Sequence, residues 1–180
     1  VDNANRSIFN AANSNPHYSG MGTTLVLGVF QEERLMLGHI GDSRCYRLRD
    51  AQLAQVTKDH SLLQEQIDAG LITAAQAATS ANKNLVTRAL GVEDTVLLEV
   101  TEQKVEPGDL FLMCSDGLSD MVDDERVANI LRQEGSLEDK VTQLVAAANA
   151  NGGRDNISVL LALAGEGSKK RGLMSRLLGK

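Results

Sequence analysis

Most apolar positions in this chain alternate with polar ones or form short runs, which is the pattern of β-strands. Residues 24–30 and 34–40 are apolar runs on either side of a polar turn, and they predict a hairpin of mostly buried strands. Residues 45–49 and 52–56 alternate more strictly, so we expect a second hairpin with one solvent-facing side. Together the two hairpins predict four consecutive antiparallel strands.

Helical spacing marks other parts of the chain. Residues 1–13 show it with no capping signal ahead, so we expect the second half of a helix and a segment removed before it. Residues 59–90, rich in Ala and Gln, predict two short helices with a mobile connection. Two amphipathic helices are expected at 124–133 and 137–150.

Strands return in the second half of the chain. Residues 96–105 and 110–114 flank a turn at 106–109 and predict a hairpin, and a last strand is expected at 157–164. Strand runs interrupted by helix pairs indicate an α+β fold, most simply antiparallel sheets with helices packed outside. A chain of 180 residues with 42% hydrophobic content can bury one core, which we assign to one domain over residues 1–164.

Charge and hydropathy limit the partners. A net charge of -6 argues against nucleic acid, because binding to the phosphate backbone needs clustered Lys and Arg. Residues 165–180, rich in Gly, Ser and Lys, predict a flexible basic tail rather than a membrane-surface helix, since stable anchoring needs two signals. No stretch approaches the length of a membrane span, so we expect a cytoplasmic protein without stable membrane insertion.

Three aspartates stand where an expected strand begins or ends, namely Asp42, Asp116 and Asp155. Each one alone is explained as a turn former, because Asp bonds its own backbone in turns. If the strand ends converge, however, the carboxylates repel one another and lose water, which raises their pKa values unless a cation compensates. A cluster made only of carboxylates suits Mg²⁺ or Mn²⁺ better than zinc.

Six motifs resemble, in order and approximate spacing, those of the bacterial protein phosphatase 2C family. One such motif is weak support, whereas an ordered series between residues 20 and 163 is specific. The motifs are Gly20-Met21-Gly22-Thr23-Thr24, His39-Ile40-Gly41-Asp42-Ser43-Arg44, Lys58-Asp59-His60-Ser61, Thr87-Arg88-Ala89-Leu90-Gly91, Cys114-Ser115-Asp116-Gly117-Leu118 and Arg154-Asp155-Asn156-Ile157.

The resemblance implies an antiparallel β-sandwich flanked by helices and incomplete at its N-terminus. Asp116 and Asp155 match ligands of the family's two-metal centre, and Asp42 matches an aspartate of a third, weaker metal. Asn156 would orient water behind these ligands. The implied cofactors are two Mn²⁺ or Mg²⁺ ions and a third, weaker one. Residues 58–84 fall where the family carries a flap beside its active site.

The implied reaction is hydrolysis of phosphoserine and phosphothreonine in proteins by a metal-activated water, so no residue here is assigned as a catalytic nucleophile or acid. The implied partners are phosphoproteins, above all serine/threonine kinases and their targets. The family's phosphate-gripping Arg, Glu-Asp pair and Asp-Gly-Met-Gly-Gly-His element have no counterpart in this chain. We therefore expect the chain alone to be inactive and unstable, with uncovered apolar faces and unpaired sheet edges.

Other polar residues have plainer interpretations. We interpret His39 as a core histidine, and we assign the residues around His60 to capping of a helix start. Arg44 is expected to pair with a surface acid. Asp120, Asp123 and Asp124 form an acidic stretch, and we expect them to serve the N-terminus of the helix that follows.

Two other functions use the same residues. A non-catalytic pseudophosphatase or partner-binding regulatory module is consistent with the missing elements. A metal-dependent nuclease also uses carboxylates and two metals, but an acidic chain with 3% aromatic residues offers no nucleic-acid track. The sequence ahead of Val1 would separate the phosphatase from the pseudophosphatase.

Overall fold

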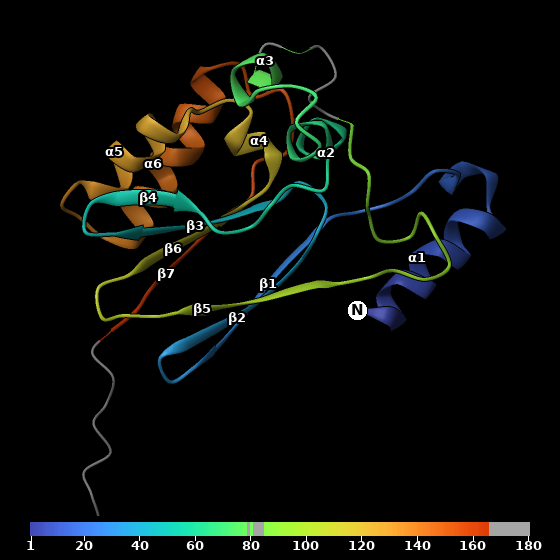
Figure 1. Cartoon of the computed structure of the whole chain (residues 1–180), viewed down its shortest axis with the longest axis horizontal. Helices are drawn as coiled ribbons and strands as arrows, with labels where there is room; N and C mark the ends of the chain where they lie inside the picture. Colours follow the sequence, from blue (N-terminus) through green and yellow to red (C-terminus); the bar gives the residue numbers. More distant parts are fainter. Residues whose placement is uncertain (79, 81–84, 166–180) are drawn as a thin grey trace, which may run out of the picture.

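Two antiparallel sheets stack face to face in the computed structural model of this chain, which describes residues 1–78, 80 and 85–165 (Figure 1). The first sheet has the strand order β1-β2-β5 and the second has the order β4-β3-β6-β7. All neighbouring strands are antiparallel, so the expected α+β sandwich is confirmed. The strands are β1 (Leu25–Gln31), β2 (Arg34–Ile40), β3 (Arg44–Arg49), β4 (Gln52–Gln55), β5 (Glu99–Lys104), β6 (Leu110–Cys114) and β7 (Val159–Leu163).

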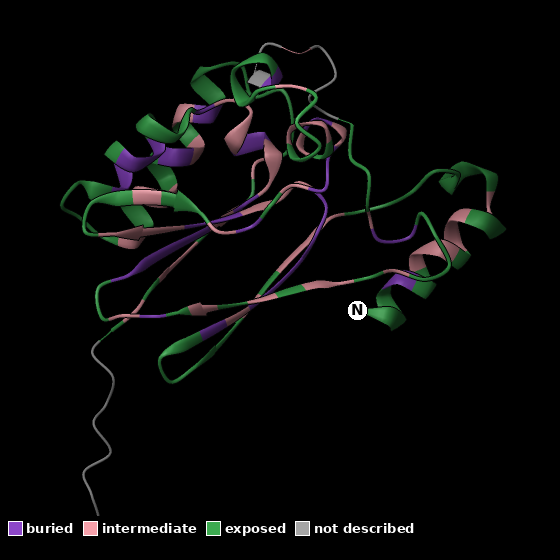
Figure 2. Cartoon of the chain, in the orientation of Figure 1, coloured by how far each residue is buried: buried purple, intermediate pink, exposed green. Residues whose placement is uncertain are grey.

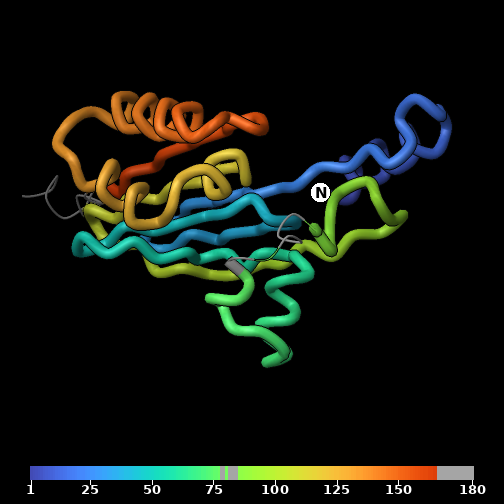
Figure 3. The backbone as a smooth tube through the Cα atoms, turned by 90° about the horizontal axis from the view of Figure 1, so that it is seen from above, coloured from blue at the N-terminus to red at the C-terminus, as the bar shows by residue number. Residues whose placement is uncertain are grey.

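Helices lie on both sides of the paired sheets. α4, α5 and α6 cover the second sheet, while α2 and α3 stand on the opposite side (Figure 3). The four helices expected at 59–90, 124–133 and 137–150 are confirmed, and the connection at 79 and 81–84 lies outside the described residues. The helices are α1 (Asp2–Ser14), η1 (Pro16–Tyr18), α2 (Leu62–Asp68), α3 (Ala74–Ala78), α4 (Asp116–Ser119), α5 (Asp124–Arg132) and α6 (Leu137–Ala150).

Alternation along the central strands of the second sheet creates two apolar cores. On β3, Cys45 faces the first sheet and Tyr46 faces the helices. On β6, Phe111 likewise faces the first sheet and Leu112 faces the helices. Figure 2 shows buried residues following these strands. The core between the sheets consists of Leu35, Leu37, Cys45, Val105 and Phe111, and the core under the helices includes Tyr46, Leu112, Leu118, Ile130 and Leu144.

β2 and β3 lie in different sheets, so the prediction of four consecutive antiparallel strands is wrong. The hairpins β1–β2 and β3–β4 both form, but a turn at Gly41, with φ of +101°, carries the chain from one sheet to the other. The sequence pattern does not reveal this change of sheet, because such a turn uses the same Gly and Asp residues as a hairpin turn.

The predicted hairpin between β5 and β6 is also wrong, because β5 pairs with β2 while β6 lies between β3 and β7. The turn at 106–109 crosses between the sheets. Buried Asp109 stabilises the crossing by accepting hydrogen bonds from Nε and Nη2 of Arg49, each at 2.6 Å, and from the Glu106 N–H at 2.8 Å.

β1 is an edge strand, so the expectation of mostly buried strands holds for β2 and is wrong for β1. Its side chains Leu27, Val29 and Phe30 are 44–45% exposed, and Leu160 and Leu163 on edge strand β7 are 54% and 56% exposed. These side chains are uncovered apolar surface of the kind that the sequence analysis expects.

α1 stands at one end of the molecule, and the helix expected there is confirmed (Figure 1). Its buried Asn5 donates to the carbonyl oxygens of Glu93 and Asp94, at 3.0 and 3.2 Å, and accepts from the Gly91 N–H at 2.7 Å. One asparagine thus ties the helix to the 91–94 loop. Among the described residues, no helix is both long and apolar enough to cross a bilayer.

Asp109→Asn should destabilise the whole protein by about 2–3 kcal/mol, because it leaves the Arg49 guanidinium without its buried carboxylate. Burial raises the pKa of Asp109, but Arg49 and the Glu106 N–H outweigh burial and hold the pKa below its ordinary value. This stabilisation is therefore present at neutral pH and is lost as the pH falls through the lowered pKa. Urea unfolding at pH 7 measures the loss.

Glu106→Gln is the matched control, since Glu106 pairs with the same Arg49 but has a 43% exposed side chain. This substitution should leave the urea midpoint close to that of the wild type, because solvent screens an exposed ion pair. Equal urea midpoints for Asp109→Asn and Glu106→Gln would contradict the assignment of Asp109 as the residue that stabilises the crossing.

Candidate metal-binding site

Asp42 lies in the turn between β2 and β3. Because Gly41 has a positive φ and a Cβ there would collide with the side chain of Thr24, only glycine fits this turn. The hydroxyls of Thr24 and Ser43 share a hydrogen bond of 2.8 Å, which ties the turn to the residue ahead of β1. The backbone that carries Asp42 is therefore fixed on both sides.

Asp116 begins α4 directly after β6, and Asp155 precedes β7. A small hydrogen-bond network joins these two places. The Ser115 N–H donates to the Ser158 carbonyl oxygen at 3.1 Å, and the Ser158 N–H donates back to Ser115 Oγ at 3.0 Å. The network keeps the end of β6 beside the start of β7, so the two aspartates are held near each other.

Gly117 allows the closest approach between these segments. A Cβ at Gly117 would collide with the carbonyl oxygen of Asn156, and that oxygen also accepts a hydrogen bond from Ser115 Oγ at 3.0 Å. Asn156 thus contributes through its backbone, and its N–H donates to Asp155 Oδ1 at 2.6 Å. The water-orienting role expected for the Asn156 side chain stays a prediction.

The three aspartates share one electrostatic environment. Burial raises the pKa of Asp116 above its ordinary value, and the charge of Asp155 raises it further. Burial also raises the pKa of Asp42, with the charge of Asp116 as the next largest cause. The structure therefore brings together the three aspartates singled out by sequence, and their role as metal ligands remains to be proposed.

These carboxylates fit a hard divalent cation by their chemistry, because a cation would neutralise the repulsion that, together with burial, raises the pKa values of Asp42 and Asp116. Within the described part of the chain, their oxygens do not gather as a set of three within 4.8 Å of one another. Repulsion between like charges favours wider distances between these oxygens. The ligands of a two-ion centre are also divided between two ions, so they need not gather around one point.

The helix assignment is confirmed for Asp123, which is the N-cap of α5, and for Asp124, which lies in its first turn. Asp120 precedes that helix and also belongs to the carboxylate group. Its charge raises the pKa values of both Asp42 and Asp116. The residue that caps α5 is Asp123, which accepts from the Arg126 N–H at 2.7 Å. The four-residue spacing of Asp116 and Asp120, which predicts a shared helical face, could have revealed this grouping.

Arg44 pairs with an acid as expected, but the pair is more buried than a surface pair. Its Nη2 lies 2.7 Å from Asp59 Oδ2, and the two side chains are 26% and 12% exposed. Asp59 also accepts from the Gln55 amide at 2.8 Å. Because Asp59 contributes to the raised pKa of Asp42, Arg44 offsets part of the negative charge near the site.

His39 and His60 stack on each other, with ring centroids 4.6 Å apart and an interplanar angle of 14°. His39 is buried in the strand as interpreted. The capping assignment near His60 holds for its neighbour, since Ser61 Oγ accepts from the Gln64 N–H at 3.3 Å at the start of α2. His60 itself is buried and hydrogen-bonded, a role that sequence reasoning missed.

His39, His60 and Glu99 bring one potential metal-ligand atom each within 4.8 Å of the others. Two observations argue against a metal there. The lone pairs of stacked imidazoles lie in parallel ring planes and do not point at a common ion. Moreover, His60 Nδ1 accepts from the Gly41 N–H, so neutral His60 carries its proton on Nε2, the atom that faces Glu99. The arrangement is a hydrogen-bonded chain.

The insertion that follows His60 leaves and returns at the same place. The Leu62 N–H donates to the Leu85 carbonyl oxygen at 2.9 Å, and the Thr87 N–H donates to the His60 carbonyl oxygen at 2.8 Å. α2 and α3 lie between these points and stand out from the sheets (Figure 3). The base of the insertion is therefore next to the turn that carries Asp42.

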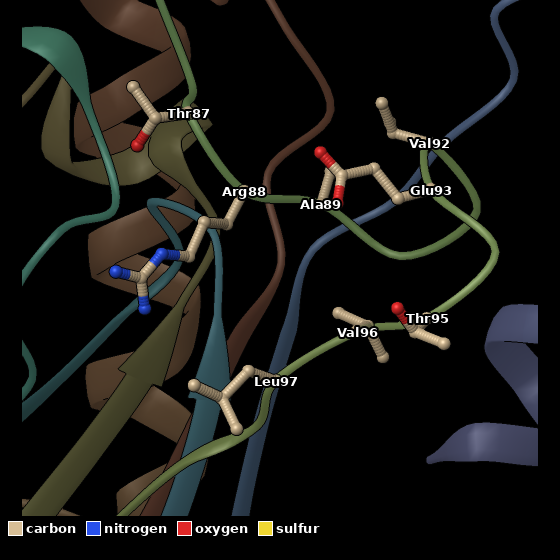
Figure 4. A pocket seen from close by; sticks show the side chains of 8 residues that line it. All are labelled: Thr87, Arg88, Ala89, Val92, Glu93, Thr95, Val96 and Leu97. Atoms are coloured by element: carbon tan, nitrogen blue, oxygen red, sulfur yellow. The ribbon is translucent and has the colours of Figure 1, made fainter.

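A pocket of about 300 Å³ lies beyond this base, along the segment from Thr87 to Leu97 (Figure 4). Arg88 lies on its wall. Burial lowers the pKa of His60 and the hydrogen bond from His60 lowers the pKa of Glu99, and the charge of Arg88 adds a smaller lowering to each. The histidine pair thus has a cation on its pocket side. The lining residues are Thr87, Arg88, Ala89, Val92, Glu93, Thr95, Val96 and Leu97.

A sequence model described as protein phosphatase 2C matches residues 2–162. The chain is 38% identical over 161 residues to the serine/threonine phosphatase stp of Listeria welshimeri, covering 89% of this chain and 64% of that protein. The chain thus spans a little under two thirds of that relative's length.

Solved structures agree with this match. The crystal structure of the Mycobacterium tuberculosis serine/threonine phosphatase PstP/Ppp superposes with a TM-score of 0.84 at 39% identity, covering 90% of this chain and 68% of that one. A second structure, the catalytic domain of PstP in complex with 2 manganese ions, gives a TM-score of 0.80 at 39% identity, covering 90% and 67% of the two chains.

Gly117→Ala should destabilise the whole protein by about 1–3 kcal/mol, because the new methyl group must displace the Asn156 carbonyl. It should also weaken Mn²⁺ binding, because the displaced backbone carries Asp155. Thermal unfolding with and without Mn²⁺ reports both effects. Gly165→Ala is the control, since a Cβ there meets nothing within 4 Å. A Gly117→Ala variant as stable as Gly165→Ala would show that this close approach is unimportant.

Proposed function

This chain belongs to the protein phosphatase 2C family, and on that premise we propose that the whole protein hydrolyses phosphoserine and phosphothreonine esters in other proteins. The observation that carries the proposal is that hydrogen bonds between Ser115 and Ser158 hold Asp116 and Asp155 at the adjoining ends of β6 and β7. Relatives named serine/threonine phosphatases support the same reaction.

Asp116 and Asp155 would hold two divalent cations, and Asp42 would hold a third, weaker one. Such ions, when bound, activate a water molecule and neutralise charge on the phosphoryl oxygens. Mn²⁺ is the first choice for an assay, because the PstP catalytic domain binds 2 manganese ions. Whether Mg²⁺ replaces it in the cell is a separate measurement.

The chain's own contribution is preorganisation. The Ser115 and Ser158 hydrogen bonds hold the backbones of Asp116 and Asp155 in place, and glycine turns fix the backbone of Asp42. The fold therefore holds the carboxylates close together before any cation binds. Binding relieves their repulsion and requires little rearrangement of the backbone. Residues 58–84 would act as a flap, because their base adjoins the Asp42 turn.

The proposed substrates are phosphorylated proteins, with serine/threonine kinases and their targets as the expected partners. A cytoplasmic location, expected because no stretch approaches the length of a membrane span, and the absence of a nucleic-acid partner, expected from the acidic composition, remain predictions. The basic tail at 166–180 lies outside the described residues.

Asp116→Asn and Asp155→Asn should each lower phosphatase turnover of the whole protein by at least about 100-fold, because each removes a charged ligand of the two-ion centre. Both should abolish the rise in melting temperature caused by Mn²⁺ while leaving the fold intact. Asp42→Asn should cost only about 10-fold, since its ion is the weaker one. Steady-state hydrolysis of a phosphothreonine peptide and thermal unfolding measure these effects.

Asp123→Asn is the matched control, because Asp123 caps α5 and stands outside the carboxylate group. It should retain turnover and the Mn²⁺ effect. Wild-type turnover in Asp116→Asn would defeat the two-ion assignment.

The 180-residue chain by itself should be inactive, because the carboxylates described here are only part of the ligand set that the family resemblance implies. Exposed apolar side chains such as Leu27 and Val29 support the expectation that it is also unstable alone. Manganese-dependent hydrolysis by this chain at the rate of the whole protein would overturn this prediction. A whole protein that binds phosphopeptides without turnover would instead favour the pseudophosphatase alternative.

A further inference from the structure

His60 contacts the turn that carries Asp42 through two hydrogen bonds to one residue. Its Nδ1 accepts from the Gly41 N–H at 3.1 Å, and its backbone N–H donates to the Gly41 carbonyl oxygen at 3.0 Å. Both polar backbone groups of Gly41 are therefore bound by His60. The side-chain bond is buried, and a buried N–H left without an acceptor costs about 1–3 kcal/mol.

Glu99 fixes the tautomer that this contact requires. Its Oε2 accepts from His60 Nε2 at 3.1 Å, and an imidazole that donates at Nε2 presents a lone pair at Nδ1. Glu99 is on β5, directly opposite His39 on β2, so the carboxylate comes from a strand far away in sequence. A carboxylate behind an imidazole is a common means of fixing the ring's tautomer and orientation.

His39 fixes the plane of the His60 ring. The two rings stack, and His39 Nε2 donates to the Lys58 carbonyl oxygen at 2.7 Å. The ring of His60 is thus held by a stack on one face, a carboxylate at Nε2 and the Gly41 N–H at Nδ1. Gly41 packs closely against Thr24, because a Cβ at Gly41 would collide with the Thr24 side chain.

We propose that His60, fixed by Glu99 and His39, is the positioning residue of the Gly41–Ser43 turn and determines how Asp42 is presented to a divalent cation. His60 is not itself a ligand in this proposal. The inference rests on the proposed function only in taking Asp42 as a metal-binding residue, and it does not require turnover.

Acid provides a test of the contact. Burial lowers the pKa of His60, Glu99 acts in the opposite direction, and His39 and Arg88 lower the pKa further. Nδ1 therefore remains an acceptor below the pH at which an ordinary histidine titrates. Once His60 is protonated, an Nδ1–H faces the Gly41 N–H, and the two donors cannot bond. Loss of this bond should add to the fall in Mn²⁺ affinity that protonation of Asp42 and Asp116 causes in acid, and a non-titrating residue at position 60 should remove only the added part.

The experiment compares His60→Ala with His60→Gln in the whole protein. An amide reproduces both bonds, since its oxygen can accept from Gly41 and its NH₂ can donate to Glu99. At pH 7.5 we expect His60→Ala to raise the Kd of the weaker Mn²⁺ site about 10-fold and His60→Gln to stay within about 2-fold of wild type. Calorimetry measures the affinities, and circular dichroism checks folding. His17→Gln, in exposed η1, is the matched control and should leave affinity unchanged.

A double-mutant cycle with Asp42→Asn shows whether His60 acts through Asp42. If it does, His60→Ala has no further effect on Mn²⁺ affinity in the Asp42→Asn background. Nitrogen-15 NMR of wild-type imidazoles gives a readout that needs no variant, and it should show His60 protonated at Nε2.

Four results would overturn the inference: wild-type affinity in His60→Ala, equal loss in His60→Ala and His60→Gln, additive effects in the cycle, or an Nδ1-protonated tautomer. Absence of any Mn²⁺ binding by the wild type would overturn both this inference and the metal assignment. A wild type that binds Mn²⁺ without hydrolysing phosphopeptides contradicts only the proposed function, and the affinity differences among the His60 variants then still support the inference.

Discussion

Mutual repulsion of carboxylates at one end of the sandwich is the constraint on which the site depends. Asp42, Asp116 and Asp155 would move apart if their backbones were free, because like charges repel, and burial further disfavours the ionised forms of Asp42 and Asp116. The fold prevents this separation with short-range devices: a glycine turn against Thr24 and the serine hydrogen bonds between β6 and β7. Charge is concentrated where a cation can be bound.

The two-sheet architecture makes this concentration achievable. Asp42 is in the turn where the chain crosses from the first sheet to the second, whereas Asp116 and Asp155 stand at the ends of paired strands within the second sheet. The crossing therefore places the third aspartate beside the other two. A second crossing, at 106–109, is stabilised by the hydrogen bonds that Arg49 donates to buried Asp109. Polar side-chain contacts therefore stabilise both places where the chain changes sheet.

Side chains behind the Asp42 turn also hold its backbone in place. His60 binds Gly41, Glu99 binds His60, and the Thr87 N–H binds the His60 carbonyl oxygen at the base of the 62–84 insertion. One continuous set of contacts thus joins β5, the Asp42 turn and the insertion. Most of these contacts are hydrogen bonds in buried positions, where water cannot readily replace a lost partner. We therefore expect the loss of one bond to displace the backbone beside it.

Local patterns in the sequence predicted most of the helices and strands and pointed to the carboxylates that we propose as metal ligands. Periodicity placed the strands and helices, and the positions of Asp42, Asp116 and Asp155 beside strand ends singled out the carboxylates, because these signals are local. Only the tertiary structure decided that β2 and β3 belong to different sheets, that β5 pairs with β2, and that β1 is an exposed edge. It alone joined Glu99 to His60. Strand partners and charge neighbours are set by packing between segments distant in the chain, and local patterns of hydrophobicity carry no record of that packing.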